Sequence, residues 1–396
     1  MSKVNILGVN LSNLSRNAVE RKIDDYLKVN QQKLIVTPNA EFILAAQHDE
    51  EFFYILNHAD LAVLDGSGPQ LAARLIGHNI ERYPGADLVQ YVLGLASEQR
   101  LKVLILNWQH GLSSEHDLRL MLQTKYPGAI AKVMDCSRTE KKLDVTMIND
   151  FKPQIILSTL GAPFQEKMLY HLRGGVPSLS LVMGIGGALD FLTGKIARAP
   201  QVMRLIGVEW LWRLYKQPQR LGRIWNAVAV FLYKFIKWQF ILPYLYRPNV
   251  ACFLYKKSPS GHVVLMVERA DMSGHWQLPQ GGTDGESIER AGRRELFEEL
   301  GVTQFETRRV YKNVFRYNFH KQRRAEVQRH LGYKGQKQSL YVAEYLGSDE
   351  HFAINFWDHT AWRWVPVDRL LTQTYEIRRD GYQKFLDKFN EYIKES

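Results

Sequence analysis

Short apolar runs recur along the first half of the chain, and each is followed by polar loop residues and an amphipathic stretch. Strands that alternate with helices in this way predict a parallel sheet covered by helices on both faces, a Rossmann-like α/β architecture. Ligands on such sheets bind beyond the carboxyl ends of the strands. The runs are Lys33-Leu-Ile-Val-Thr37, Leu61-Ala-Val-Leu64, Val103-Leu-Ile-Leu106, Gln154-Ile-Ile-Leu-Ser158 and Leu179-Ser-Leu-Val-Met183.

The polar residues after these runs are therefore the candidate site. Thr37 and Asn39 follow the first run, and Asp65 follows the second. A carboxylate at a strand end can take the proton from an attacking sugar hydroxyl, although Asp65 also suits a turn or a helix cap. The glycine-rich segment Gly184-Ile-Gly-Gly187 can cradle a diphosphate or simply make a tight turn.

The pattern changes near Asn249. Two apolar runs, 250–255 and 262–267, are joined through Ser258-Pro-Ser-Gly261 and predict a β-hairpin. A helical stretch that ends at Gly301 then places Glu295, Glu298 and Glu299 on about the same face. Crowded carboxylates of this kind suit Mg²⁺ or Mn²⁺, and the alternative is a solvated acidic face.

Composition adds limits to this picture. A chain of 396 residues suggests two domains, or three, and the two cysteines, Cys136 and Cys252, favour a reducing cytoplasmic setting. No apolar stretch near Met1 has the length of a signal peptide. The net charge of +11 is concentrated in two regions, 198–247 and 321–337. The first suggests an anionic membrane surface and the second a polyphosphate or RNA, with a solvated basic face as the alternative for each.

The segment 224–245 is apolar and aromatic, but Lys234 and Lys237 lie in its middle. A lysine at the centre of a membrane-spanning helix costs about 3 kcal/mol, so we expect the segment to lie in the membrane interface and not to cross the bilayer. The alternative is a helix packed on one of the two domains.

The ordered motifs of the first half resemble the WecG/TagA/CpsF family of glycosyltransferases. The resemblance implies transfer of an N-acetylmannosamine-type sugar, with inversion, from a UDP donor to an undecaprenyl-diphosphate-linked acceptor. It rests on Thr37-Pro-Asn39, Asp65-Gly66, Arg82-Tyr-Pro-Gly-Ala-Asp87, Gly161-Ala-Pro-Phe-Gln165-Glu166-Lys167, Gly184-Ile-Gly-Gly-Ala-Leu-Asp190, Arg198-Ala-Pro200 and a long segment from Gly207 to Arg223.

This resemblance also implies residue roles. Asp65 is the base, Thr37 and Asn39 position substrate, and Gln165 contacts the nucleotide-sugar. The leaving diphosphate is neutralised by three arginines, Arg213, Arg220 and Arg223. No Asp-x-Asp pair follows a strand, which predicts a transfer without a metal. One region departs from the family: Asn107-Trp-Gln-His-Gly111 and Met134-Asp-Cys-Ser-Arg138 replace a glycine-rich turn and a small-residue loop, which puts donor or acceptor identity in question.

The spacing of the second half, from Glu286 through Arg294-Glu295-Leu296 and Glu298-Glu299 to Gly301, resembles the Nudix hydrolases. This implies an α/β/α domain with a mixed sheet, Mg²⁺ or Mn²⁺ on the three glutamates, and Glu298 in catalysis. Arg294, Glu286, Gly281, Gly282 and Gly301 would have structural roles, although the loop before Glu286 is one residue short.

Flanking segments resemble the bacterial RNA pyrophosphohydrolases and their diadenosine-polyphosphate-hydrolase relatives. These segments are Tyr246-Arg-Pro-Asn-Val250, Trp276-Gln-Leu-Pro-Gln-Gly-Gly282, Gly335-Gln-Lys-Gln338 and Trp362-Arg-Trp-Val365. The resemblance makes Arg247, Arg269 and Lys337 candidate phosphate ligands. It makes Asp358 a candidate further metal ligand or base.

The sequence thus predicts a bifunctional cytoplasmic enzyme at the inner face of the cell membrane, with a homo-oligomer as a further possibility. Its domains are expected at 1–200 for the transferase core, 201–246 for a basic aromatic appendage, and 247–396 for the hydrolase. The hydrolase would cleave an RNA 5′ end or a dinucleoside polyphosphate. The alternatives are that it acts on nucleotide-sugars, or that one half is a non-catalytic binding module.

Overall fold

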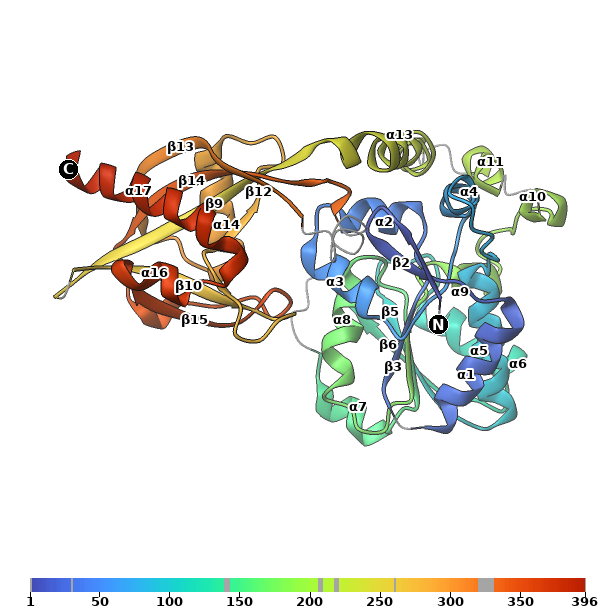
Figure 1. Ribbon diagram of the computed structural model, residues 1–396. Coiled ribbons are helices and arrows are strands. Elements are labelled where there is room, and N and C mark those ends of the chain that lie inside the picture. Colours follow the sequence, from blue (N-terminus) through green and yellow to red (C-terminus); the bar gives the residue numbers. More distant parts are fainter. Residues whose placement is uncertain are drawn as a thin grey trace. The chain divides into compact units, whose positions relative to one another are not determined.

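The computed structural model describes residues 2–29, 31–138, 143–205, 209–216, 221–259, 261–319 and 331–395. These residues form two compact units, Met1–Ile236 and Lys237–Ser396. Each unit has its own sheet and its own core (Figure 1). The separate status of 201–246 as a third part remains a proposal.

The first unit alternates strands and helices, as the apolar runs predict. In chain order the elements are β1 (Lys3–Ile6), β2 (Val9–Ser12), α1 (Arg16–Lys28), β3 (Lys33–Val36), α2 (Ala40–Ala46), α3 (Glu50–His58), β4 (Leu61–Ala62), α4 (Ser67–Leu75), α5 (Gly85–Glu98), β5 (Lys102–Trp108), α6 (Glu115–Lys125), β6 (Ile130–Cys136), α7 (Val145–Phe151), β7 (Ile155–Ser158), α8 (Phe164–Arg173), β8 (Leu181–Gly184), α9 (Ala188–Leu192), α10 (Gln201–Leu205), α11 (Glu209–Lys216), α12 (Leu221–Trp225), the π-helical turn η2 (Asn226–Val230) and α13 (Phe231–Ile236).

The main sheet of this unit has six strands in the order β4-β3-β8-β7-β5-β6, and every neighbouring pair is parallel. Helices α1, α5 and α6 lie on one side of it and α7 and α8 on the other (Figure 1). The predicted Rossmann-like α/β architecture is therefore confirmed. An additional antiparallel hairpin, β1–β2, precedes the sheet.

Polar side chains determine where the helices near the strand ends begin. The carboxamide of Asn39 accepts a hydrogen bond from Phe42 N at the start of α2. Ser114 and Asp117 form a reciprocal capping box at the start of α6. Helix α4 follows Gly66, whose φ of +98° is open to glycine and strained for other residues. Because Gly66 holds the cap position, Asp65 is not the N-cap of α4.

The last helices of the first unit have one buried and one exposed apolar face. Phe231 and Phe235 are buried where α13 meets α2 and α4. On the other side Trp225 is 65% exposed, Leu232 39% and Tyr233 63%. The helix therefore packs on its own unit, as the alternative interpretation expected, and still presents apolar side chains to solvent. Within the described residues, no helix is both long enough and apolar enough to cross a membrane.

The second unit is built around a seven-stranded sheet. Its elements are the π-helical turn η3 (Lys237–Ile241), η4 (Leu242–Tyr244), β9 (Tyr246–Ser258), β10 (Gly261–Arg269), β11 (Trp276–Gln277), β12 (Gln280–Gly282), α14 (Ile288–Leu300), β13 (Phe305–Asn318), β14 (Gly335–Tyr345), η5 (Asp349–His351), β15 (His359–Pro366), η6 (Val367–Arg369), α16 (Leu370–Gln373), η7 (Glu376–Arg378) and α17 (Arg379–Glu395).

This sheet is mixed, because β14 runs parallel to β9 whereas the other pairs are antiparallel. The predicted hairpin is confirmed as β9 and β10, with Ser258 opposite Gly261. One cluster of buried residues joins α14 to the sheet and a second joins α17 to it, which gives the expected α/β/α layers. Cys136 and Cys252 are both buried, and neither forms a disulfide.

Candidate active sites

A cavity of about 800 Å³ lies in the first unit at the carboxyl ends of the parallel strands. Its lining comes from the loops after β3, β4, β5, β6, β7 and β8, as expected for an open parallel sheet. It includes Thr37, Asn39, Asp65 and Gln165, four of the residues that sequence reasoning selected. It also contains both segments that depart from the family pattern, through Trp108 and Arg138.

Asp65 and Thr37 converge on Gly85 at one end of the cavity. A Cβ atom on Gly85 would lie 3.4 Å from Asp65 Oδ2 and 3.4 Å from Thr37 Oγ1. The backbone of Asp65 is fixed because its N–H donates to the carbonyl of Pro38. A carboxylate and a hydroxyl thus border the same space beside Gly85. This arrangement can receive a substrate hydroxyl and accept its proton.

Gln165 and Glu166 form a brace beneath the same cavity. Gln165 Oε1 accepts hydrogen bonds from the backbone N–H groups of Gly161 and Gly186, at 2.9 and 3.0 Å. Gln165 Nε2 donates to Glu166 Oε1 at 2.7 Å. The amide of Gln165 therefore ties two loops together, whereas its expected contact with the nucleotide-sugar stays a prediction. Glu166 is fully buried, and this burial raises the pKa of its carboxyl to about 7.

Two of the three arginines predicted at the leaving diphosphate lie in described helices of the first unit. Arg213 lies in α11 and Arg223 in α12, and the structure describes the backbone of each but not its side chain. Arg220 lies outside the described residues. Their expected role at the leaving diphosphate remains a proposal.

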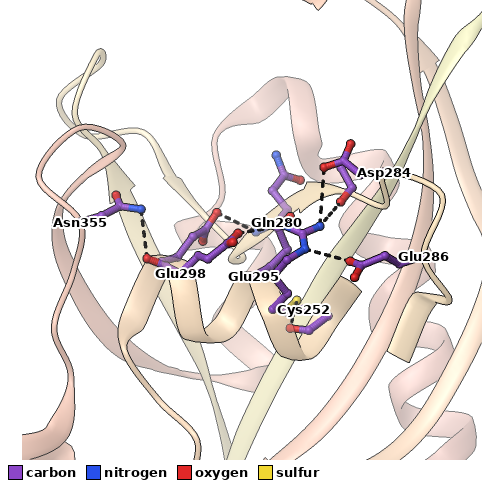
Figure 2. Close-up of polar contacts among 11 residues, drawn as sticks. Cys252, Gln280, Asp284, Glu286, Glu295, Glu298 and Asn355 are labelled. Carbon is purple, nitrogen blue, oxygen red and sulfur yellow. Dashed lines mark hydrogen bonds and ion pairs between the residues drawn. The ribbon is translucent and has the colours of Figure 1, made fainter. Parts of the chain in front are cut away.

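In the second unit, Arg294 pairs with acidic residues of α14 and of the loop before it. Figure 2 shows four of these acidic residues, Asp284, Glu286, Glu295 and Glu298. The guanidinium of Arg294 donates to Glu286 at 2.9 Å, to Glu295 and Glu298 at 2.8 Å each, and to the carbonyl of Gly282 at 2.7 Å. Arg294 therefore joins the loop to the helix and neutralises part of the carboxylate charge. Burial raises the pKa of Glu295 to about 7, against the opposing effect of Arg294.

The glutamates fit a divalent cation by their chemistry but are not gathered around one point. Glu298 faces Arg294, whereas Glu299 Oε1 accepts a hydrogen bond from Gln280 N. In the described part of the chain, no three His, Cys, Asp or Glu side chains are grouped as metal ligands. Glu295 and Glu299 are nonetheless buried oxygen donors on one helix, and Mg²⁺ prefers such ligands.

Two glycines let the preceding strand approach α14 closely. A Cβ on Gly281 would lie 2.0 Å from Glu295 Oε2, and one on Gly282 would lie 2.5 Å from Arg247 Nη2. The short loop that follows turns through Asp284 and Gly285, whose φ values are +46° and +86°. The short loop thus closes in a tight turn, with Gly281 facing Glu295 of the helix and Gly282 facing Arg247 of β9 on the other side of the strand. Gly301 ends α14 in the left-handed conformation, with φ of +69°.

The candidate phosphate ligands are not all brought to this site. Arg247 packs on Gly282 and lowers the pKa of Glu295 by its charge, so it lies beside the helix. Arg269 makes a two-pronged ion pair with Asp271. Lys337 is exposed and lies on the face of β14 that also carries Tyr341 and Ala343, which pack in the cluster with α14, whereas Gln336 and Gln338 lie on the opposite face.

Asp358 and His359 lie beside the carboxylates at the start of β15. Asp358 is near Arg269, and its backbone carbonyl accepts from Ala270 N. His359 Nε2 lies 3.8 Å from Glu299 Oε2. Burial lowers the pKa of His359 to about 4, so its imidazole is neutral at pH 7. The role of Asp358 as a metal ligand or base remains a proposal.

Sequence reasoning missed a buried polar network next to Glu299. Gln338 Nε2 donates to Asn249 Oδ1 at 3.1 Å and to Gln280 Oε1 at 2.8 Å. Arg378 also donates to Gln280 Oε1, at 3.1 Å. The only signal in the sequence was Gln280 within Gln280-Gly-Gly282 and the alternating pair Gln336 and Gln338. The network holds Gln280, whose backbone N–H binds Glu299.

Comparison with known proteins divides the chain close to the boundary between its two units. Residues 4–243 match the family model described as Glycosyl transferase WecG/TagA/CpsF family, which is more than half of the chain. Residues 245–387 match the model of the NUDIX domain.

Individual proteins also match each part. The chain is 29% identical over 243 residues to the N-acetylglucosaminyldiphosphoundecaprenol N-acetyl-beta-D-mannosaminyltransferase of Staphylococcus aureus strain MW2, with 60% of this chain and 93% of that protein covered. Among solved structures, a Caenorhabditis elegans Ap4A hydrolase binary complex is 19% identical, covers 37% of this chain and 98% of its own, and gives a TM-score of 0.29. The NUDIX domain of Shewanella oneidensis NrtR complexed with ADP ribose is 18% identical, with 37% and 89% covered and a TM-score of 0.27.

Proposed function

The chain belongs to the WecG/TagA/CpsF family of glycosyl transferases and carries a NUDIX domain behind it, and we propose that its first unit transfers an N-acetylmannosamine-type sugar from UDP to an undecaprenyl-diphosphate-linked acceptor. The relatives in Staphylococcus aureus are named for an N-acetylmannosaminyl transfer to N-acetylglucosaminyldiphosphoundecaprenol. The observation that supports this most directly is the convergence of Asp65 and Thr37 on the open space beside Gly85.

In the proposed reaction Asp65 acts as general base. Its carboxylate accepts the proton of the acceptor hydroxyl while the hydroxyl oxygen bonds to the anomeric carbon of the donor sugar. The bond from that carbon to the phosphate oxygen breaks on the opposite face, so the configuration inverts and UDP leaves. Thr37 and Asn39 orient the reacting groups, and Arg213, Arg220 and Arg223 neutralise the departing diphosphate. We propose that this transfer needs no metal ion.

We propose that the first unit meets its lipid-linked acceptor at the cytoplasmic surface of the membrane. The apolar side chains of Trp225, in α12, and of Leu232 and Tyr233, in α13, are exposed, and basic residues recur through the same segment. Such a surface suits the boundary between headgroups and acyl chains of an anionic membrane.

For the second unit we propose Mg²⁺- or Mn²⁺-dependent hydrolysis of a nucleoside polyphosphate, either an RNA 5′ end or a dinucleoside polyphosphate. Glu295, Glu298 and Glu299 would hold the cation, which supplies charge stabilisation and a more acidic water. Glu298 carries out the catalytic role, and Arg294 holds the loop of Gly282 against the helix. The second candidate substrate is a nucleotide-sugar, which the presence of a sugar-nucleotide enzyme in the same chain favours.

Two matched variants of the full chain test both halves. Asp65→Asn removes the base and leaves the hydrolase intact, whereas Glu298→Gln affects only the second unit. Transfer is measured with UDP-N-acetylmannosamine and a lipid-diphosphate N-acetylglucosamine acceptor. Hydrolysis is measured by phosphate and nucleotide release, with Mg²⁺, from triphosphorylated RNA, diadenosine polyphosphate and UDP-sugars.

We expect Asp65→Asn to lower the transfer rate by at least about 100-fold, within the range for loss of a general base, without changing hydrolysis. Glu298→Gln should lower the rate of hydrolysis without changing the rate of transfer. Asp25→Asn, which changes an exposed carboxylate on α1, serves as the surface control. Full transfer by Asp65→Asn would refute the assignment of the base. Cleavage of UDP-sugars alone would establish the second candidate substrate, and no cleavage of any substrate would favour a binding module.

A further inference from the structure

A stacked tryptophan–arginine pair lies on the cavity of the first unit. The guanidinium carbon of Arg138 lies 3.7 Å from the centre of the Trp108 ring, and Arg138 Nε donates to the carbonyl of Leu160 at 2.6 Å. Both residues line the cavity, and both belong to the segments that depart from the family pattern. The pair therefore presents a flat aromatic and cationic surface that the proposed chemistry at Asp65 does not use.

The topology of the sheet places the strands that carry this pair far from the strand that precedes Asp65, and the side chain of Arg138 reaches from there to the Leu160–Gly161 loop after β7. Asp65 follows β4 at one edge, whereas Trp108 ends β5 and Arg138 follows β6 at the other edge. With neighbouring strands about 4.8 Å apart, four intervals from β4 to β5 and five to β6 correspond to about 19 and 24 Å. A nucleotide-sugar is elongated, with the sugar and the base at the two ends of its diphosphate. A sugar at Asp65 therefore directs the base toward Trp108 and Arg138.

The middle of the cavity suits the diphosphate and not the base. It is formed by the loops of Gly161 and of Gly186-Gly187, which come from the central strands β7 and β8 and are tied together by Gln165. A Cβ on Gly186 would have no neighbour within 4 Å, so this loop leaves room for phosphate oxygens, while the N–H groups of Gly161 and Gly186 are already bonded to Gln165. The flat surfaces of Trp108 and Arg138 are then left for a flat group of the ligand.

We propose that Trp108 and Arg138 bind the nucleobase of the donor and select one that presents carbonyl oxygens, as uracil does. Arginine carries only hydrogen-bond donors, so it favours the carbonyl O4 of uracil over the amino group at the same position of cytosine. The indole ring of Trp108 fixes the plane of the guanidinium. This assignment rests on the proposed transfer from a UDP-sugar.

The test is a calorimetric titration of the full chain with UDP, CDP and ADP. The buffer contains EDTA so that the second unit does not consume the nucleotides. The variants are Arg138→Ala, Arg138→Lys, Trp108→Ala and Trp108→Phe. Arg119→Ala is the matched control, because Arg119 is an exposed arginine of α6 that is paired with Glu115.

We expect Arg138→Ala to weaken UDP binding by roughly tenfold, the effect of losing one charge-assisted hydrogen bond, and to abolish most of the preference for UDP over CDP. Arg138→Lys should behave like Arg138→Ala, since a lysine keeps the charge but not the planar fork. Trp108→Ala should show a similar but smaller loss. Trp108→Phe should recover part of it, and Arg119→Ala should bind as wild type does.

Equal weakening of UDP, CDP and ADP in Arg138→Ala, with rescue by Arg138→Lys, would overturn the proposal, because the guanidinium would then bind phosphate. Unchanged UDP binding in both the Arg138 and Trp108 variants would overturn it as well. A wild-type chain that binds none of the three nucleotides would instead refute the proposed donor itself, and the assignment of these two residues would fail with it.

Discussion

Replacing Glu166 with glutamine tests whether the carboxyl group beneath the first cavity is protonated when the protein is folded at low pH. Glu166 accepts a hydrogen bond from Gln165, and its Oε2 has no hydrogen-bond partner among the residues that the structure describes. Glutamine has nearly the same shape, keeps an acceptor for Gln165 and cannot ionise. Glu166→Gln should therefore preserve the brace between the Gly161 and Gly186 loops and remove only the titration.

The magnitude follows from the pKa of this group, which burial raises from the ordinary 4.5 to about 7 in the folded protein. A raised carboxyl pKa means that the folded protein holds the proton more tightly than the unfolded chain. The resulting stability is fully present below pH 4.5 and is lost as the pH rises through 7. At about 1.4 kcal/mol per pH unit, the wild-type free energy of unfolding falls by about 2 kcal/mol from this group between pH 5.5 and pH 8.

The variant should not show this loss. The free energy of unfolding of Glu166→Gln, relative to wild type, should thus be about 2 kcal/mol higher at pH 8 than at pH 5.5. Urea unfolding of the full chain measures it, with hydrogen exchange of amides in α8 and β8 as a probe of the first unit. Glu115→Gln, at an exposed position of α6, is the control. A difference between variant and wild type that is equal at both pH values would refute the reasoning.

Three further predictions concern the other features of the molecule. Gly281→Ala should slow hydrolysis at least about tenfold in a phosphate-release assay, because a Cβ 2.0 Å from Glu295 Oε2 displaces that carboxylate; an unchanged rate would show that Glu295 is not needed where it lies. Arg294→Gln should lower the unfolding free energy of the second unit by roughly 2 kcal/mol, since it leaves the buried carboxylate of Glu295 without its cationic partner. Denaturation that matches wild type would contradict this. Trp225→Glu and Leu232→Glu should each weaken sedimentation with anionic vesicles by roughly tenfold, whereas undiminished binding would exclude this face from membrane contact.

The elements of the first unit could be predicted because most strands of its main sheet contain a short apolar run. A run such as 155–158 is buried on both faces, and only a central parallel strand uses such a sequence well. The order of the strands could not be predicted, because it depends on which helices pack together and not on any single run. The position of β8 between β3 and β7 is of this kind.

The candidate sites also contain some features that the sequence could predict and others that it could not. Glu295, Glu298 and Glu299 follow from spacing along one helix, which sequence states directly. The partners of Gln165 and Gln280 come from loops and strands far away in the sequence, so neither set of hydrogen bonds could be predicted from the sequence. For Lys337, strand alternation gives only its face: it lies opposite Gln336 and Gln338, on the side that Tyr341 shares, and its role as a phosphate ligand stays a prediction.

The order β4-β3-β8-β7-β5-β6 also has a consequence for biosynthesis. The strand that joins the two halves of the sheet is the last one translated, so a nascent chain that ends before Leu181 has two separate half-sheets and no shared edge. Gly186 then arrives just behind this strand to meet Gln165. Because domains fold as units and in order of synthesis, the ribosome delivers the central piece of the transferase site only shortly before it begins the hydrolase.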